Sequence, residues 1–170
     1  LTKPRIALLV TLTSVVGYLA GSEGPTVWLT LGHLAVGTTL CACAASILNQ
    51  VLERDTDARM QRTLARPIPA GRISANEGAA FGLAAAFGSC AYLLFLVGWL
   101  TALLAVCTLA SYLLVYTPLK RVTPLNTIVG AAPGALPPVG GWAAARGDIG
   151  PEAAYLFAIV FLWQLPHFLA

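Results

Sequence analysis

Charged residues are scarce in this sequence. Asp, Glu, Lys and Arg together make up 10% of its 170 residues, whereas hydrophobic residues make up 58% and the mean hydropathy is +0.78. Soluble domains carry about 25% charged residues, so this composition excludes a soluble globular protein and indicates an integral membrane protein. In a membrane protein the net charge of +3 reports orientation first, and we expect no nucleic-acid partner.

The sequence contains four cysteines, which are Cys41, Cys43, Cys90 and Cys107. All four fall within apolar runs, and their spacing matches neither a zinc site nor an iron–sulfur site. We therefore interpret them as small apolar side chains that fill space between helices.

The N-terminal segment lacks the features of a cleavable signal. Lys3 and Arg5 lead directly into an apolar run of spanning length, and no small-residue cleavage site ends it. We expect this first helix to be retained. The sequence begins without Met and stops at Ala170 inside an apolar run. We therefore expect residues 1–170 to form one transmembrane domain that is incomplete at its C-terminus.

Six apolar segments are long enough to cross a bilayer, which takes about 20 residues per helix. We predict an all-α bundle of transmembrane helices over residues 6–22, 27–52, 76–97, 100–116, 125–143 and 151–170. Ser74 and Glu77 have the spacing of a capping box at the start of the third helix. The fifth segment contains Pro133, Pro137 and Pro138, so we expect that helix to be broken or kinked beside a cavity.

Positive charges fall almost entirely on one side of the membrane in this arrangement. Nine of the ten lie in the N-terminal segment or in the loops after the second and fourth helices, and only Arg146 lies on the opposite side. The positive-inside rule therefore places the N-terminus and both basic loops in the cytoplasm. His33 lies about 16 residues before Asn49, roughly 24 Å along a helix, so we expect it near the far side of the membrane.

Polar chemistry is concentrated in residues 49–67, which read NQVLERDTDARMQRTLARP. If the second helix continues, Asn49, Glu53 and Asp57 recur every four residues and share one face, with Asp55 on the opposite side. An amide and two carboxylates suit Mg²⁺, which takes its remaining ligands from water and from a substrate's phosphate oxygens. Arginines well shaped for holding phosphate follow at Arg54, Arg59, Arg62 and Arg66. A solvated loop whose charges pair with each other is the alternative interpretation.

Three blocks of the sequence resemble a known family in order and spacing. They are residues 49–67, the segment YTPLKRVTPLNTIVGAAPGALPPVGGW and the segment FLWQLPHF. Together they are similar to the intramembrane prenyltransferases of the UbiA type, and among these to the heme O synthases, also called protoheme IX farnesyltransferases. The first block alone would indicate only the superfamily.

The resemblance implies nine transmembrane helices around a cavity that opens toward the cytoplasm. Two aspartate-rich motifs in such proteins hold Mg²⁺ and the diphosphate of an isoprenoid donor. The first motif, N-x-x-x-D-x-x-x-D, maps onto Asn49, Glu53 and Asp57, with Glu replacing Asp in the middle position. The second motif should follow shortly after His167 and would lie beyond this sequence. The family usually has two prolines before that histidine, whereas here the first of them is Leu165.

The implied reaction moves a farnesyl group from farnesyl diphosphate to a vinyl carbon of heme B, with addition of water, and gives heme O. Glu53 and Asp57 would hold Mg²⁺ with support from Asn49. The diphosphate would be held by four cations, which are Arg62, Arg66, Lys120 and Arg121. Further substrate contacts are expected from Arg54, Asp55, Arg59, Asn126, Trp163, Gln164 and His167.

Several of these residues have alternative interpretations. Asp55 has the spacing to pair with Arg59, and the Lys120–Arg121 pair has the position of a membrane-surface anchor. Trp163 is expected to be buried and to line the heme cavity. His167 is interpreted as a partner of a heme propionate, an iron ligand or a proton relay, with a packed histidine as the alternative.

The same residues are open to other functional interpretations. A quinone precursor or a chlorophyll-type ring is the alternative acceptor, and a transporter with a permeation path along the fifth helix is the alternative of another class, besides a purely structural subunit. We expect the bacterial cytoplasmic (inner) membrane as the location, and heme A synthase or terminal oxidase assembly factors as additional partners.

Overall fold

The computed structural model describes residues 1–120, 122–123 and 126–169, with the side chains of the last helix described as far as Pro166, and the regular secondary structure in these residues is helical. The elements are α1 (Pro4–Gly21), α2 (Trp28–Leu52), α3 (Arg54–Asp57), α4 (Ala75–Leu96), α5 (Trp99–Ala110), the π-helical η1 (Ser111–Tyr116), α6 (Thr117–Leu119), α7 (Asn126–Arg146) and α8 (Pro151–Leu169). The all-α prediction is confirmed, and long helical stretches occur in all six predicted ranges.

The start of α4 shows why these segments fold locally as predicted. The Ser74 hydroxyl accepts a hydrogen bond from the Glu77 amide (3.2 Å), and the Glu77 carboxylate accepts one from the Ser74 amide (2.9 Å). These reciprocal bonds satisfy donors that would otherwise lack partners in the first helical turn. The predicted capping box is therefore confirmed.

Four helical stretches in the described part of the chain are long and apolar enough to cross a membrane. They are Pro4–Gly21, Trp28–Leu52, Ala75–Leu96 and Trp99–Leu119. Large side chains on their outer faces are exposed, including Phe87 at 73% and Phe95 at 81%. Such surfaces fit a lipid environment, since soluble proteins rarely expose large apolar patches. The chain is thus an integral membrane protein, and the spanning roles of α7 and α8 stay predictions.

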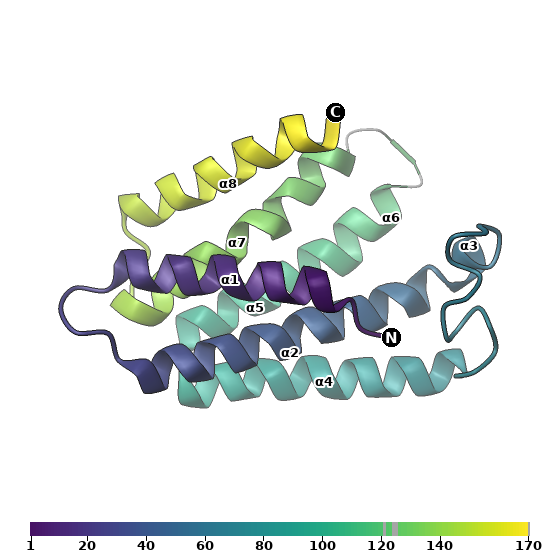
Figure 1. The fold of residues 1–170 in the computed structure, drawn as a ribbon, viewed down its shortest axis with the longest axis horizontal. Coiled ribbons are helices and arrows are strands. Elements are labelled where there is room, and N and C mark those ends of the chain that lie inside the picture. The colour runs from purple at the N-terminus through teal and green to yellow at the C-terminus, as the bar shows by residue number, and fades with distance from the viewer. Residues whose placement is uncertain (121, 124–125, 170) are drawn as a thin grey trace.

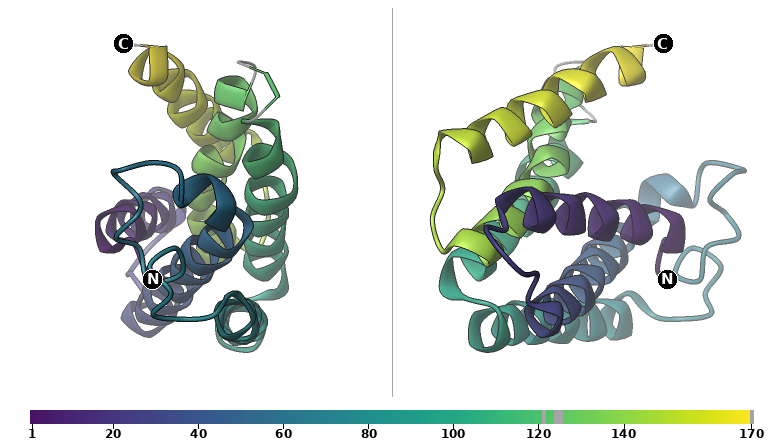
Figure 2. Two further views of the ribbon diagram at one scale, coloured as in Figure 1. Left: turned by 90° about the vertical axis from the view of Figure 1, so that its right-hand side faces the viewer. Right: turned by 60° about the vertical axis from the view of Figure 1, so that its left-hand side comes forward.

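Helix α7 lies at the centre of the bundle and packs against α1, α5 and α8, while α2 packs against α1 and α4 (Figures 1 and 2). The α1–α7 crossing is so close that it requires glycine. A Cβ atom at Gly17 would lie 2.7 Å from the Cα of Pro138, and one at Gly141 would lie 2.7 Å from the Tyr18 nitrogen. The two backbones therefore touch at this crossing, which fixes α1 against the central helix.

The fifth segment is expected to be broken or kinked, and the break does not occur. Helix α7 continues from Asn126 to Arg146 through Pro133, Pro137 and Pro138. A proline removes one backbone donor and crowds the preceding turn, which in an isolated helix is strongly unfavourable. Here α1, α5 and α8 enclose the helix, and the Thr101 hydroxyl of α5 donates a hydrogen bond to the Gly140 carbonyl (3.2 Å). Tertiary packing therefore maintains the helix.

The charged segments gather at one end of the bundle. The N-terminus, α3 with the loop that follows it, and α6 lie at the same end (Figure 1). The connection from α1 to α2 lies at the other end, where Glu23 pairs with Arg146. The fold thus brings together polar segments that are far apart in the sequence.

Candidate active site

A buried polar cluster lies at the end of α2 and includes Asn49, Glu53 and Asp57. The helix ends at Leu52, Glu53 has φ −98° and ψ 3°, and α3 then begins at Arg54. The Glu53 amide donates to the Asn49 carbonyl (3.0 Å), and the Asp57 amide donates to the Glu53 carbonyl (2.8 Å). These bonds carry the helical register across the break. Asn49 and Asp57 are each 1% exposed and Glu53 is 5% exposed, so all three side chains face the interior.

Each buried carboxylate has a cationic partner. Asp57 pairs with Arg66, and Glu53 pairs with Lys120. The Asn49 side-chain amide donates a second hydrogen bond to Glu53 Oε2 (2.7 Å). A buried charge without a partner would cost several kcal/mol. These contacts explain how two carboxylates are accommodated inside an apolar bundle.

The loop after α3 folds back and places Arg66 beside Asp57. Thr63 is 2% exposed, and its hydroxyl donates to the Asp57 carbonyl (2.8 Å). The Arg66 amide in turn donates to the Thr63 carbonyl (3.0 Å). Arg66 therefore reaches Asp57 through a folded loop and not through regular helical spacing.

A π-helical turn brings the second basic loop to the same place. The Thr117 hydroxyl lies 2.8 Å from the Tyr112 carbonyl and 3.1 Å from Asn49 Oδ1, and it can donate to either. The Tyr112 and Tyr116 rings stack with centroids 5.5 Å apart, and Lys120 Nζ lies 5.9 Å from the Tyr116 centroid. A π turn is wider than an α turn and often occurs at functional sites. Here it directs Thr117 toward Asn49 and is followed by Lys120, which lies over an aromatic face.

Lys3 belongs to this cluster, although the sequence indicated for it only an orienting charge. It lines the same cavity as Asn49 and Lys120. Burial lowers the pKa of Lys3 below its ordinary value of 10.5, and the positive charge of Arg66 lowers it further, while Glu53 and Asp57 act in the opposite direction. The signal available in the sequence was its place immediately before α1, on the side of the basic loops.

A cavity of about 420 Å³ leads from the charged cluster into the bundle. Lys3, Asn49 and Lys120 line its polar end. The rest of the lining consists mostly of apolar and small side chains from α1, α2, α5, η1 and α7, for example Val10, Ala45, Leu104, Tyr112 and Pro137. An apolar cavity with a few convergent charges fits an amphiphile that has an anionic head and an apolar tail.

The oxygen ligands at the end of α2 can bind Mg²⁺ only if a substrate supplies further ligands to the same ion. The described residues contain no group of three or more His, Cys, Asp and Glu side chains that could hold a metal ion. Asn49, Glu53 and Asp57 offer one amide and two carboxylates, fewer than the oxygen ligands of an octahedral Mg²⁺. Phosphate oxygens and water commonly complete such a shell, so these residues suit a metal ion that is held jointly with a diphosphate.

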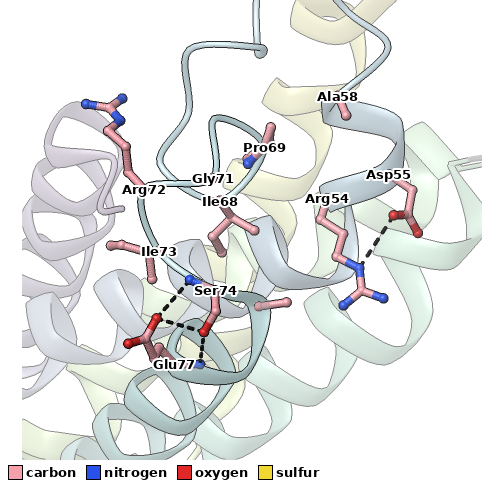
Figure 3. Close-up of a pocket in the computed structure, with 11 residues that line it drawn as sticks. Arg54, Asp55, Ala58, Ile68, Pro69, Gly71, Arg72, Ile73, Ser74 and Glu77 are labelled. Atoms are coloured by element: carbon pink, nitrogen blue, oxygen red, sulfur yellow. Dashed lines mark hydrogen bonds and ion pairs between the residues drawn. The ribbon is translucent and has the colours of Figure 1, made fainter.

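The other arginines near the motif point away from the cluster. Arg54, Arg59 and Arg62 are exposed. Arg54 pairs with Asp55 (Nε to Oδ1, 3.5 Å). The expected pair of Asp55 with Arg59 is wrong, because α3 ends at Asp57 and the helical spacing does not extend to Arg59. Arg54 and Asp55 instead line an open groove with Arg72 and Glu77 at the start of α4 (Figure 3).

The remaining predicted residues are distributed over α7 and α8. Gln164 lines the cavity and lies beside Gly134, where a Cβ atom would be 2.9 Å from its Nε2. Asn126 is half-buried at the start of α7, and its Oδ1 accepts a hydrogen bond from Thr127 (3.1 Å). Trp163 is 64% exposed and not buried as expected, because α8 packs mainly on α7 and leaves its outer face open.

The last predictions concern one arginine and the two histidines. Arg121 and the side chain of His167 lie outside the described part of the protein. His33 Nδ1 lies 2.7 Å from the Tyr92 hydroxyl, which links α2 to α4. This contact gives His33 a packing role remote from the charged cluster.

Comparisons with known proteins agree with this geometry. The model of the UbiA prenyltransferase family matches residues 10–170. A protoheme IX farnesyltransferase of Koribacter versatilis is 44% identical over 99% of this chain and 55% of its own length. One of Solibacter usitatus is 46% identical over 99% of this chain and 61% of its own length. The chain thus spans a little more than half the length of these relatives.

Two solved structures share the fold. A UbiA homolog from Aeropyrum pernix K1 superposes with a TM-score of 0.76 at 26% identity, over 97% of this chain and 62% of that protein. A digeranylgeranylglyceryl phosphate synthase superposes with a TM-score of 0.82 at 17% identity, over 95% of this chain and 56% of that protein. The second likeness concerns the fold alone.

Proposed function

Because the chain belongs to the UbiA prenyltransferase family, we propose that it forms the donor-binding part of an enzyme that transfers a farnesyl group from farnesyl diphosphate to heme B. Two relatives of nearly equal similarity carry the name protoheme IX farnesyltransferase, which supports this substrate pair. The observation that carries the proposal is the buried cluster of Glu53, Asp57, Arg66 and Lys120 at the polar end of an apolar cavity.

The charged cluster would act on the leaving diphosphate. Arg66, Lys120 and Lys3 would hold its oxygens and stabilise the negative charge that develops as the allylic C–O bond breaks. Glu53 and Asp57, with Asn49 beside them, would hold Mg²⁺, which when bound supplies further neutralisation of the diphosphate charge. Such stabilisation is effective because the cluster is fixed in place by buried hydrogen bonds before a substrate arrives.

The cavity would hold the isoprenoid tail and limit the access of water to the reacting carbon. In the overall reaction the allylic carbon loses diphosphate and forms a bond to a vinyl carbon of heme B. A water molecule supplies the hydroxyl group on the other vinyl carbon, and the products are heme O and diphosphate. Gln164 of α8 lines this cavity, and Asn126 is half-buried at the start of α7; both would contact the acceptor.

The charge distribution supports an orientation for this enzyme. One end of the bundle carries most of the positive charges, because the N-terminus, the loop after α3 and α6 lie there (Figure 1). These segments contain Lys3, Arg66, Lys120 and the exposed arginines, so we place that end in the cytoplasm. We propose the bacterial inner membrane as the location, and heme A synthase or terminal oxidase assembly factors as candidates to receive the product.

Replacing Asp57 by Asn tests the function. The change keeps the size of the side chain but removes the charge that pairs with Arg66. In the full-length protein, incubated with farnesyl diphosphate, heme B and Mg²⁺, we expect heme O formation to fall by about 10² to 10³, as for loss of one electrostatic contact in other enzymes. Heme O is measured by mass spectrometry, and helix content by circular dichroism confirms folding.

Asp148→Asn is the matched control, because Asp148 is exposed in the turn between α7 and α8 at the other end of the bundle. Normal heme O formation by Asp57→Asn would refute the assignment of the site. Transfer to an aromatic acid but not to heme B would instead favour a quinone-precursor acceptor. The transporter alternative relied on a broken fifth helix, and α7 is continuous.

A further inference from the structure

The cavity ends against a layer of buried apolar side chains. On α1, α2 and α7 the lining residues furthest along the helix from the charged cluster are Ser14, Thr38 and Gly140. One helical turn further along, each helix contributes a residue to a single packed cluster. We call its buried core the apolar plug, which consists of Tyr18, Leu34, Leu93 and Ala102, all at most 7% exposed.

Leu93 is the residue where the cavity and the apolar plug meet. It lines the cavity and is 1% exposed. Its side chain lies against Gly37 of α2, where an added Cβ atom would be 2.7 Å from Leu93 Cγ. Close packing on that side holds Leu93 in place, so its side chain forms a fixed floor and not a movable gate.

The distance from the charged cluster to this floor can be obtained from helix geometry. Lys3 and Ser14 are about eleven residues apart on α1, as are Asn49 and Thr38 on α2, so the polar end and the floor are about 16 Å apart. An extended chain of three isoprene units contains about twelve bonds and reaches about 14 Å, whereas four units reach about 19 Å. The cavity therefore fits three units and is too short for four.

We infer that the apolar plug, with Leu93 as its floor, sets the length of the isoprenoid donor at three units. This inference rests on the proposed function, since it assumes that the diphosphate lies at the charged cluster and the tail in the cavity. Selection by such a floor is steric. A longer donor has to leave part of its chain outside or displace packed side chains, and a shorter donor leaves apolar space unfilled.

The test is the binding of geranyl, farnesyl and geranylgeranyl diphosphates to the full-length protein with Mg²⁺, measured by isothermal titration. The native protein should bind farnesyl diphosphate most tightly. Leu93→Ala removes the floor, and we expect it to raise the affinity for geranylgeranyl relative to farnesyl diphosphate by about tenfold or more. Leu94→Ala is the matched control on the same helix, since Leu94 is 44% exposed, and it should leave the ratio unchanged.

A second variant keeps the test independent of the stability of Leu93→Ala. Ala105 lines the cavity and packs against the apolar plug, so Ala105→Leu should raise the floor and shift the preference toward geranyl diphosphate. Equal affinities for all three donors in the native protein, or unchanged ratios in both variants, would overturn the inference while the proposed function stands. Failure to bind any of the three diphosphates would overturn both.

Discussion

The α1–α7 crossing gives the sharpest prediction about stability, because two glycines there leave no room for a Cβ atom. Replacing Gly17 by Ala places a Cβ atom 2.7 Å from Pro138 Cα and closer still to the Pro138 carbonyl group. Real Cβ contacts lie beyond about 3 Å, and the obstructing atoms are backbone atoms that cannot rotate away. The helices therefore have to separate by roughly 1 Å, which disturbs the packing of both.

The expected cost follows from overpacking of a close interface, which is about 1–3 kcal/mol. For a protein of this size each kcal/mol lowers the melting temperature by about 2–4 °C, so we expect a fall of about 2–12 °C. The same substitution at Gly88 of α4 is the control, since a Cβ there would meet no heavy atom within 4 Å among the described residues. Ala is the better helix former, so Gly88→Ala should be neutral or stabilising by up to about 1 kcal/mol.

The assay is thermal unfolding in detergent, followed by circular dichroism, for Gly17→Ala, Gly141→Ala and Gly88→Ala. We expect the melting temperature to fall for Gly17→Ala and Gly141→Ala and to stay the same or rise for Gly88→Ala. Because Lys3 directly precedes α1, the two crossing variants should in addition weaken diphosphate binding. Equal melting temperatures for all three variants would show that the crossing tolerates separation, and the account of how α1 is held would be refuted.

Two further predictions concern the charged cluster. Burial lowers the pKa of Lys3 below its ordinary value, so its positive charge is lost at lower pH than that of a free lysine. Diphosphate binding should therefore weaken at alkaline pH before a free lysine would lose its charge, whereas Lys3→Arg stays charged and should preserve binding there. An identical pH profile of both proteins in isothermal titration would exclude this role for Lys3. Thr117→Val removes the hydroxyl beside Asn49 Oδ1, which should lower the free energy of unfolding by about 1 kcal/mol and reduce heme O formation several-fold. Thr117→Ser keeps the hydroxyl and should preserve both stability and activity. A fully active Val variant would show that this hydrogen bond does not position Asn49.

Features governed by local sequence could be predicted. The capping box at Ser74 needs only neighbouring residues. The shared face of Asn49, Glu53 and Asp57 follows from their spacing, because backbone hydrogen bonds carry the helical register past the end of α2. The helical class followed from the composition, since a chain with so few charges has to satisfy its backbone groups within helices. These predictions depend on short-range rules that operate in the same way in any fold.

Features governed by tertiary contacts could not be predicted. The continuity of α7 depends on its enclosure by three helices, and the route of Arg66 to Asp57 depends on a folded loop. The π-helical turn that directs Thr117 toward Asn49 has no signal in the residues themselves. The place of Lys3 in the site also depends on tertiary contacts, because only the α1–α7 crossing determines that α1 begins beside the charged cluster.

The balance of charge in the cluster explains why its carboxylates and its cations are needed together. Arg66, Lys120 and Lys3 face two carboxylates, Glu53 and Asp57, which leaves a surplus of one positive charge. A diphosphate carries a charge of roughly −3 near neutral pH, because its phosphate groups have pKa values near 6 or below. The surplus alone cannot neutralise it, whereas the surplus together with one divalent cation can. Removing a carboxylate would raise the positive surplus but lose metal affinity, so we expect Mg²⁺ to strengthen diphosphate binding in the native protein far more than in Asp57→Asn.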